Sequence, residues 1–413
     1  MKSRSMRWSA YGILGVLVFS LVRAITGSSD LTSVGTFNAA LLLAIPIALA
    51  GLGGLFSERA GVVNIGLEGM MVMGTWAAGF WGYQRGPWMG IVMAVIFGTI
   101  AAAVHAVATI SFGVDHVVSG VAINLIAPGI VRYLSVIVYQ DSNIPGAGPT
   151  QSPSVQSIGS NGLPFLSGGH VLGWQSPDLL GSIGAKGWFF ISDISRILRG
   201  LTGDVSYVTM LCLLLFPLSW YLLWRTKFGL RLRSAGEAPV AAESLGVNVY
   251  RVKYIGVLIS GALAGLAGGF LAIVASSNYQ EGQTGGRGFI GLAAMLFGNW
   301  RPGGLLMGSA LFGFSDALQL RASDAVHSAL LVIAIGFAVY AVAQWRQGRR
   351  VGGAVTLALG LGVFALFTYV KELPGPFVTM TPYVTTLVVL SLATQRLRMP
   401  AKDGVPYRKG GDS

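Results

Sequence analysis

The sequence has 413 residues, of which 53% are hydrophobic and 11% are charged. A soluble domain carries about 25% charged residues, so this composition excludes a soluble globular protein and predicts an all-α, polytopic helical membrane protein. The short alternating strands typical of a membrane β-barrel are absent from the sequence. The formal charge of +12 does not indicate nucleic-acid binding, because the basic residues gather in alternate loops and so orient a membrane protein.

The N-terminal third contains several apolar runs that are long enough to cross a hydrocarbon core of about 30 Å. The first run, 8–25, resembles a signal peptide, but no A-x-A cleavage site lies near Arg23. We therefore expect the segment 1–30 to hold an extra N-terminal helix that is retained. A first-half transmembrane bundle, 31–139, is then expected from four further runs: 34–56, 62–83, 88–110 and 117–139.

A long polar stretch, 140–204, is rich in Gly, Ser and Pro and predicts a loop. A second-half bundle, 205–320, follows, and within it the apolar segment 289–300 has only 12 residues, which predicts a half-span or a re-entrant segment. An extra helical hairpin at 325–370 and a last helix with a basic tail at 376–413 complete the chain. The total is about 10–12 membrane segments.

The distribution of Lys and Arg orients these segments. Basic residues concentrate in the N-terminus, in the loop 225–253, in 345–350 and in the tail from 396 onward, which places these parts in the cytoplasm and 140–204 outside. Glycine accounts for 59 residues. A repeat of Gly every four residues, at 261, 265 and 269, predicts close helix packing rather than phosphate binding.

The loop 225–253 carries six Lys/Arg, and its middle part, 236–246, reads as a short helix. Pro suits the first turn of a helix and Gly suits the position just past its end. So short a helix is unstable in water by itself, so it either docks on a soluble partner or belongs to a solvated loop that only fixes topology. The candidate docking residues are Gly236, Glu237, Pro239, Ala241, Ala242 and Gly246.

Few polar residues lie in the spans, and these are the candidates for a translocation path. Glu68 and the neighbouring Asn64 lie at the start of a span, where a carboxylate either faces a cavity or caps exposed amides. Asn124 can line a path or clamp two helices. Phe289 can stack on a base or simply pack in the bundle.

The segments 64–71 and 289–296 share a faint similarity, NIGLEGMM against FIGLAAML. Interrupted helices in corresponding halves indicate a transport pathway, although chance similarity between apolar stretches gives the same pattern.

The sequence contains no Ser/His/Asp arrangement, metal-ligand spacing or GxxxxGK[ST] loop, so we expect neither catalysis nor direct ATP or metal binding. The single cysteine, Cys212, excludes an intrachain disulfide framework.

Five blocks of the sequence carry a family resemblance. Residues 57–70, SERAGVVNIGLEGM, closely resemble a signature of permease subunits of bacterial ABC importers for branched-chain amino acids, sugars and nucleosides. Residues 118–124, 228–237 and 246–251 resemble the nucleoside branch, and the tail block 403–407, DGVPY, also fits.

The resemblance covers 38–320 and 376–409, whereas the first helix, 8–25, and the hairpin 325–370 lie outside it. It implies that two similar permeases pair, that P-loop ATPases dock through 225–253, and that an extracytoplasmic substrate-binding lipoprotein contacts 140–204. ATP would be used by the partner chain, and the permease itself would hold no cofactor.

The expected function is therefore that of a permease subunit, not an enzyme, in the bacterial inner membrane, surrounded by lipid and importing nucleosides by alternating access. Alternative substrates within this class are simple sugars, branched-chain amino acids and riboflavin. An ion-coupled secondary transporter and an intramembrane enzyme are the alternatives from other classes.

Overall fold

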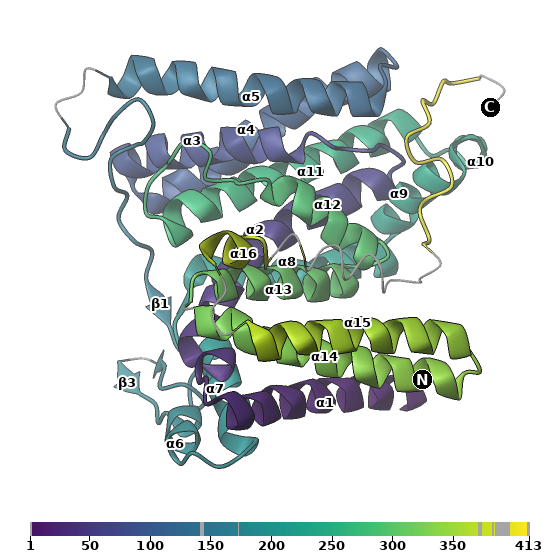
Figure 1. The fold of residues 1–413 in the computed structure, drawn as a ribbon. Coiled ribbons are helices and arrows are strands. Elements are labelled where there is room, and N and C mark those ends of the chain that lie inside the picture. Colours follow the sequence, from purple (N-terminus) through teal and green to yellow (C-terminus); the bar gives the residue numbers. More distant parts are fainter. Residues whose placement is uncertain are drawn as a thin grey trace. The chain divides into compact units, whose positions relative to one another are not determined.

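A computed structural model describes residues 2–140, 144–171, 173–321, 323–370, 374–381, 384 and 397–410. Within these residues the chain is almost entirely helical (Figure 1), which confirms the predicted all-α membrane fold. In the part described, seven helices are long and apolar enough to cross a membrane: Val34–Arg59, Pro87–Ser111, His116–Tyr139, Tyr207–Arg225, Val249–Ala275, Asp324–Arg346 and Arg350–Tyr369. Most of the expected last span, 378–395, lies outside the described residues.

The chain forms two compact units. The first contains Met1–Leu41, Asn161–Val205 and Phe314–Leu392, and the second contains Leu42–Ser160, Ser206–Gly313 and Ala393–Ser413. The boundaries between them fall within two helices, α2 (Val34–Arg59) and α13 (Pro302–Gln319), and within two short strands, β1 (Ser160–Asn161) and β4 (Val205–Ser206).

The first unit combines long apolar helices with a small polar subdomain. Its complete elements are α1 (Lys2–Thr26), the 3-10 turn η1 (Asp30–Thr32), β2 (His170–Val171), β3 (Trp174–Gln175), α6 (Leu179–Ala185), α7 (Ile191–Thr202), α14 (Ser323–Arg346), α15 (Arg350–Tyr369) and α16 (Gly375–Thr379). The expected hairpin is present as α14 and α15, and α1 lies beside it (Figure 1).

A buried ion pair holds α1 to the polar subdomain of this unit. Asp193 of α7 is fully buried, and one of its carboxylate oxygens lies 2.8 Å from Nε of Arg23. The hydroxyl of Thr32 donates a hydrogen bond of 2.9 Å to the same oxygen. Since a buried carboxylate is costly without partners, these contacts fix the position of α7. The expected loop 140–204 therefore contains helices that its polar composition did not predict.

The second unit is the helical bundle that holds the candidate site. Besides the ends of α2 and α13, its helices are α3 (Leu67–Arg85), α4 (Pro87–Ala106) with the π-helical turn η2 (Val107–Ser111), α5 (His116–Tyr139), α8 (Tyr207–Arg225), α9 (Lys227–Glu237), α10 (Pro239–Ser244), α11 (Val249–Phe270) with the π-helical turn η3 (Leu271–Ala275), and α12 (Arg287–Phe297).

Glycines bring α4 and α11 into close contact, as the glycine repeat predicted. A Cβ at Gly265 would overlap the carbonyl oxygen of Ala94, and a Cβ at Gly261 would overlap the carbonyl oxygen of Gly98. Gly269 faces Ala94 as well, where an added Cβ would lie 2.7 Å from the Ala94 Cβ. The atoms of two backbones this close make many dispersion contacts, and such contacts drive helix association in a membrane.

Candidate functional site

Two helix starts meet inside the second unit. Glu68, in the first turn of α3, accepts hydrogen bonds from the backbone N–H groups of Gly286 (2.9 Å) and Gly288 (2.7 Å) at the start of α12. The helix α12 has only 11 residues, in agreement with the predicted half-span. The carboxylate thus caps the positive end of a short helix, which is the capping alternative that the sequence left open for Glu68. The two segments that share sequence similarity are therefore joined at their N-terminal ends.

The two candidate asparagines brace the start of α3. Asn64 is fully buried, donates a hydrogen bond of 2.9 Å to the Ser260 hydroxyl and accepts one of 3.1 Å from the Gly66 N–H. Asn124 of α5 accepts from the Gly69 N–H (2.8 Å) and donates to the Ile65 carbonyl (2.9 Å). Each amide thus fixes backbone groups that precede or begin a helix.

Phe289 differs from these three polar residues. Its side chain is 47% exposed in the chain by itself, on the first turn of α12. It is the one expected path residue whose side chain is free to contact a ligand or another subunit.

The turn between α2 and α3, residues 57–62, connects several distant parts of the second unit; we call it the α2–α3 turn. Glu58 is buried and accepts a hydrogen bond of 2.6 Å from the indole Nε1 of Trp300, just beyond α12. The Arg59 guanidinium donates a hydrogen bond of 3.0 Å to the Trp300 carbonyl. Asn299 and Trp300 both have a φ of 52°. Non-glycine residues in this region cost on the order of 1–3 kcal/mol each, so these bonds hold a strained end of α12.

The same turn is held on its other side by the cytoplasmic loop and by α11. A Cβ at Gly236 would overlap the carbonyl oxygen of Arg59, so the end of α9 lies directly against the α2–α3 turn. The Lys253 ammonium of α11 is buried and donates a hydrogen bond of 3.0 Å to the Gly61 carbonyl. Glu237 lies 3.8 Å from the Arg59 guanidinium. The end of α9 and the first turns of α11 therefore both contact the turn that precedes α3.

The predicted short helix is present as α10, with Pro239 at its first position and Gly246 at a φ of 81° beyond its end. Pro239 and Ala242 are buried, whereas Ala241, Val240 and Leu245 are exposed, the last to 85%. Within the described residues, Val240, Ala241 and Leu245 thus form an apolar surface at α10 that stays largely exposed. The preceding helix α9 was not predicted from the sequence.

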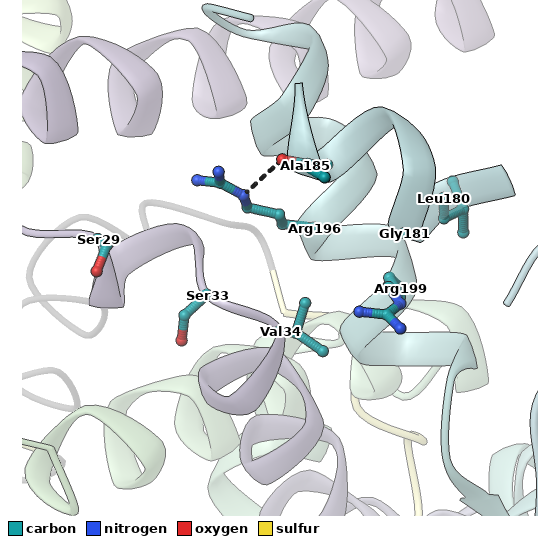
Figure 2. A pocket seen from close by; sticks show the side chains of 9 residues that line it. Ser29, Ser33, Val34, Leu180, Gly181, Ala185, Arg196 and Arg199 are labelled. Atoms are coloured by element: carbon teal, nitrogen blue, oxygen red, sulfur yellow. Dashed lines mark hydrogen bonds between the residues drawn. The ribbon is translucent and has the colours of Figure 1, made fainter. Parts of the chain in front are cut away.

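A pocket of about 410 Å³ with a mixed polar and apolar lining lies in the first unit, between α6, α7 and the segment that precedes α2 (Figure 2). Arg196 donates from Nε to the Gly184 carbonyl at 3.2 Å, and the Arg199 guanidinium lies 2.6 Å from the Asp178 carboxylate. Ser29 and Ser33 line the opposite wall. Hydroxyl and guanidinium groups suit an acidic ligand or an acidic side chain of another protein.

The sequence did not indicate the roles of Glu58 and Arg59 in the α2–α3 turn or of Lys253 and Trp300 that contact it. In the sequence, Ser57, Glu58 and Arg59 indicate only a polar break between two spans. Ionisable residues at membrane depth are often functional, and this is the sequence signal that Glu58 and Arg59 carry. Among the described residues no group of three or more His, Cys, Asp or Glu side chains could hold a metal ion.

Comparisons with known proteins identify the family of this chain. Residues 36–340 match the family described as branched-chain amino acid transport system / permease component. The guanosine ABC transporter permease protein NupQ of Bacillus subtilis is 34% identical, with 90% of this chain and 96% of the relative covered. The nucleoside ABC transporter permease protein NupC of Lactococcus lactis is 33% identical, with 89% and 95% covered. The fructose import permease protein FrcC of Rhizobium meliloti is 31% identical over 35% of this chain and 40% of its own length. No solved structure matches.

The match extends over more than half of the chain, and the apolar helices agree with a multi-pass protein of the bacterial inner membrane. Its relatives are transport components rather than enzymes. The chain belongs to the family of branched-chain amino acid transport system permease components and is a permease subunit of the ABC transporter type.

Proposed function

We propose that this chain is the membrane-spanning subunit of an ABC importer that brings nucleosides into the cell by alternating access. The observation that carries the proposal is the α2–α3 turn. It contacts the docking loop through Gly236 and leads to the start of α3, and it also binds Trp300 at the end of α12. One movement of the cytoplasmic loop thus reaches both helices of the expected path.

The mechanism uses this connection. When ATP closes the partner ATPases, α10 moves with them and displaces the end of α9. Gly236 then shifts the α2–α3 turn, which tilts α3 and, through Trp300, α12. ATP must bind the two conformations of the assembly with different affinity, since only a differential affinity shifts the equilibrium.

The proposed substrate class rests on the printed names of the two relatives that cover most of the chain. A neutral nucleoside agrees with the expected path residues, because both oxygens of Glu68 already accept backbone hydrogen bonds and Asn64, Asn124 and Phe289 carry no charge. Phe289 is placed to stack on a base, and stacking suits every nucleobase. The match to a fructose permease keeps a simple sugar as the second candidate substrate.

The proposal includes three partners. A P-loop ATPase contacts the docking residues of 225–253 and hydrolyses ATP, and a second homologous permease completes the path as a heterodimer. An extracytoplasmic substrate-binding lipoprotein contacts the part 140–204, and the pocket at Arg196 and Arg199 offers it a cationic contact.

The test is uptake of radiolabelled guanosine and adenosine by cells that lack nucleoside transport and co-express this chain with its genomic neighbours. We expect uptake of the labelled nucleosides to stop when the ATPase gene is removed. We also expect an excess of unlabelled guanosine to inhibit this uptake. Competition by fructose or leucine alone would keep the importer and change its substrate. Uptake that follows a proton or sodium gradient without the ATPase would replace the importer with a secondary transporter.

A further inference from the structure

The C-terminal tail, described over residues 397–410, folds back onto the docking loop through its residues 401–407. Figure 1 shows it in yellow beside α9 and α10. The Lys402 N–H donates a hydrogen bond of 2.9 Å to the Gly236 carbonyl. The Ala401 N–H donates one of 3.1 Å to the Glu237 carboxylate. The tail is therefore bonded to the residues at which the docking loop meets the α2–α3 turn.

Asp403 anchors the tail below this point. Both of its carboxyl oxygens are buried, and its ionisable neighbours include Glu58 at the end of α2 and Lys253 of α11. Burial, followed by repulsion from Glu58, raises the pKa of Asp403 to about 9. The protonated form of Asp403 is therefore favoured where the tail lies beside the α2–α3 turn.

Tyr407 anchors the other end of the tail to α10 and α11. Its hydroxyl donates a hydrogen bond to the Glu243 carboxylate, and its ring centre lies 5.4 Å from that of Tyr250. The Tyr250 hydroxyl donates to the Tyr407 carbonyl at 3.3 Å. The tail therefore extends from the end of α9 to the last turn of α10.

A cleft of about 510 Å³ lies between the tail and α10. It is lined by Glu237, Ala238, Pro239, Val240, Ala241, Lys402, Val405, Pro406, Tyr407 and Arg408. Val240 and Val405 are each 44% exposed on its two walls. Lys402 and Arg408 supply positive charge, whereas Glu237 is already paired with Arg59 and with the tail backbone.

We propose that the tail and α10 together form this cleft as one docking site, which seats an apolar side chain flanked by acidic residues on the P-loop ATPase partner. The apolar walls favour the burial of an apolar side chain, and the two cations at the cleft favour acidic neighbours on the partner. This inference rests on the proposed function. It adds a second wall to the docking site, from a segment far from the loop in sequence.

The experiment is cysteine labelling in inside-out membrane vesicles that contain the complete transporter. The native Cys212 is buried, so it gives little background with a membrane-impermeant maleimide. Val405→Cys reports on the tail and Leu245→Cys on the docking helix. Val351→Cys is the matched control, since residue 351 is 79% exposed in the hairpin outside the loop.

We expect the ATPase to slow labelling at residues 405 and 245 and to leave residue 351 unchanged. Protection at residue 245 with none at residue 405 would overturn the role of the tail and leave the proposed function standing. A lack of protection at both positions would overturn both. If residue 405 is labelled as slowly without the ATPase as with it, the membrane surface rather than the ATPase covers the cleft. That result would also contradict the proposal.

Charge reversal tests the electrostatic part separately. Lys402→Glu combined with Arg408→Glu is expected to lower the amount of ATPase that co-purifies with the permease. The control Lys409→Glu changes an exposed residue of the tail that does not line the cleft, and it is expected to keep the ATPase bound. Equal co-purification with both variants would refute the expected acidic contact.

Discussion

Replacing Glu68 by Gln tests whether this carboxylate acts as the cap of α12. The carboxylate accepts hydrogen bonds from the N–H groups of Gly286 and Gly288, at 2.9 and 2.7 Å. Gln retains a single acceptor oxygen, so it loses one charge-assisted bond, worth about 1.5–3 kcal/mol. It also loses the favourable interaction of a negative charge with the helix start, which is worth about 0.3–1 kcal/mol. The start of α12 should therefore be destabilised by roughly 2–4 kcal/mol.

The assay is amide hydrogen exchange of residues 286–290 in the purified permease. A change of about 2 kcal/mol corresponds to roughly 30-fold faster exchange through local opening. Glu281→Gln is the matched control, since Glu281 pairs with Arg132 at a half-exposed site instead of capping a helix. Unchanged exchange in Glu68→Gln, together with an altered preference among nucleosides, would refute the capping role and place Glu68 on the path.

Three further changes probe the helix packing, the turn and the tail. In Gly265→Leu the new side chain would overlap a carbonyl oxygen of α4, so overpacking should destabilise the purified permease by about 1–3 kcal/mol. Thermal unfolding measures this loss. The control is Gly362→Leu, where an added Cβ meets nothing within 4 Å. Lys253→Met removes a buried hydrogen bond of 3.0 Å to the α2–α3 turn. We expect ATP hydrolysis to continue while substrate uptake falls. An equal loss of ATP hydrolysis and uptake would contradict the proposed role of this bond. Since burial raises the pKa of Asp403 from its ordinary value near 3.8 to about 9, docking of the tail should be strongest at low pH and weaken as pH rises toward 9. Limited proteolysis between pH 6 and 9 should show this trend in the native chain and lose it in Asp403→Asn.

Features with local sequence signals could be predicted from the sequence. The short helix α10 follows from Pro239 and Gly246, and the close packing of the glycine face of α11 follows from the glycine repeat, although its partner α4 does not. The half-span was evident from its length. In each case the residues that fix the structure lie within one segment, so an inspection of that segment is enough.

Features that depend on distant partners could not be predicted. The basic residues of the segment that forms α9 concealed its narrow apolar face, and Leu232 and Ala235 on that face are buried. The contact between Glu58 and Trp300 joins residues 242 positions apart. The polar composition of 140–204 also concealed α7, whose buried Asp193 depends on Arg23 in the first helix.

The candidate site residues show the same difference between what local sequence signals predict and what distant partners determine. The sequence identified Asn64, Glu68 and Asn124 as unusual polar residues, and the structure supplies their backbone partners. Their part in substrate movement stays a prediction, as does the docking role of the loop.

The most direct test of the central proposal is guanosine uptake by the complete transporter reconstituted in liposomes without any ion gradient, with ATP supplied to the ATPase side. Gly246→Pro forces a φ near −65° on a residue at 81°, and it should therefore distort the end of the docking helix. We predict uptake that requires ATP and is lost in Gly246→Pro, while the assembled permease remains folded. Uptake that needs a proton or sodium gradient, and that proceeds equally in Gly246→Pro without ATP, would contradict the proposal that this chain is an ATP-driven nucleoside importer.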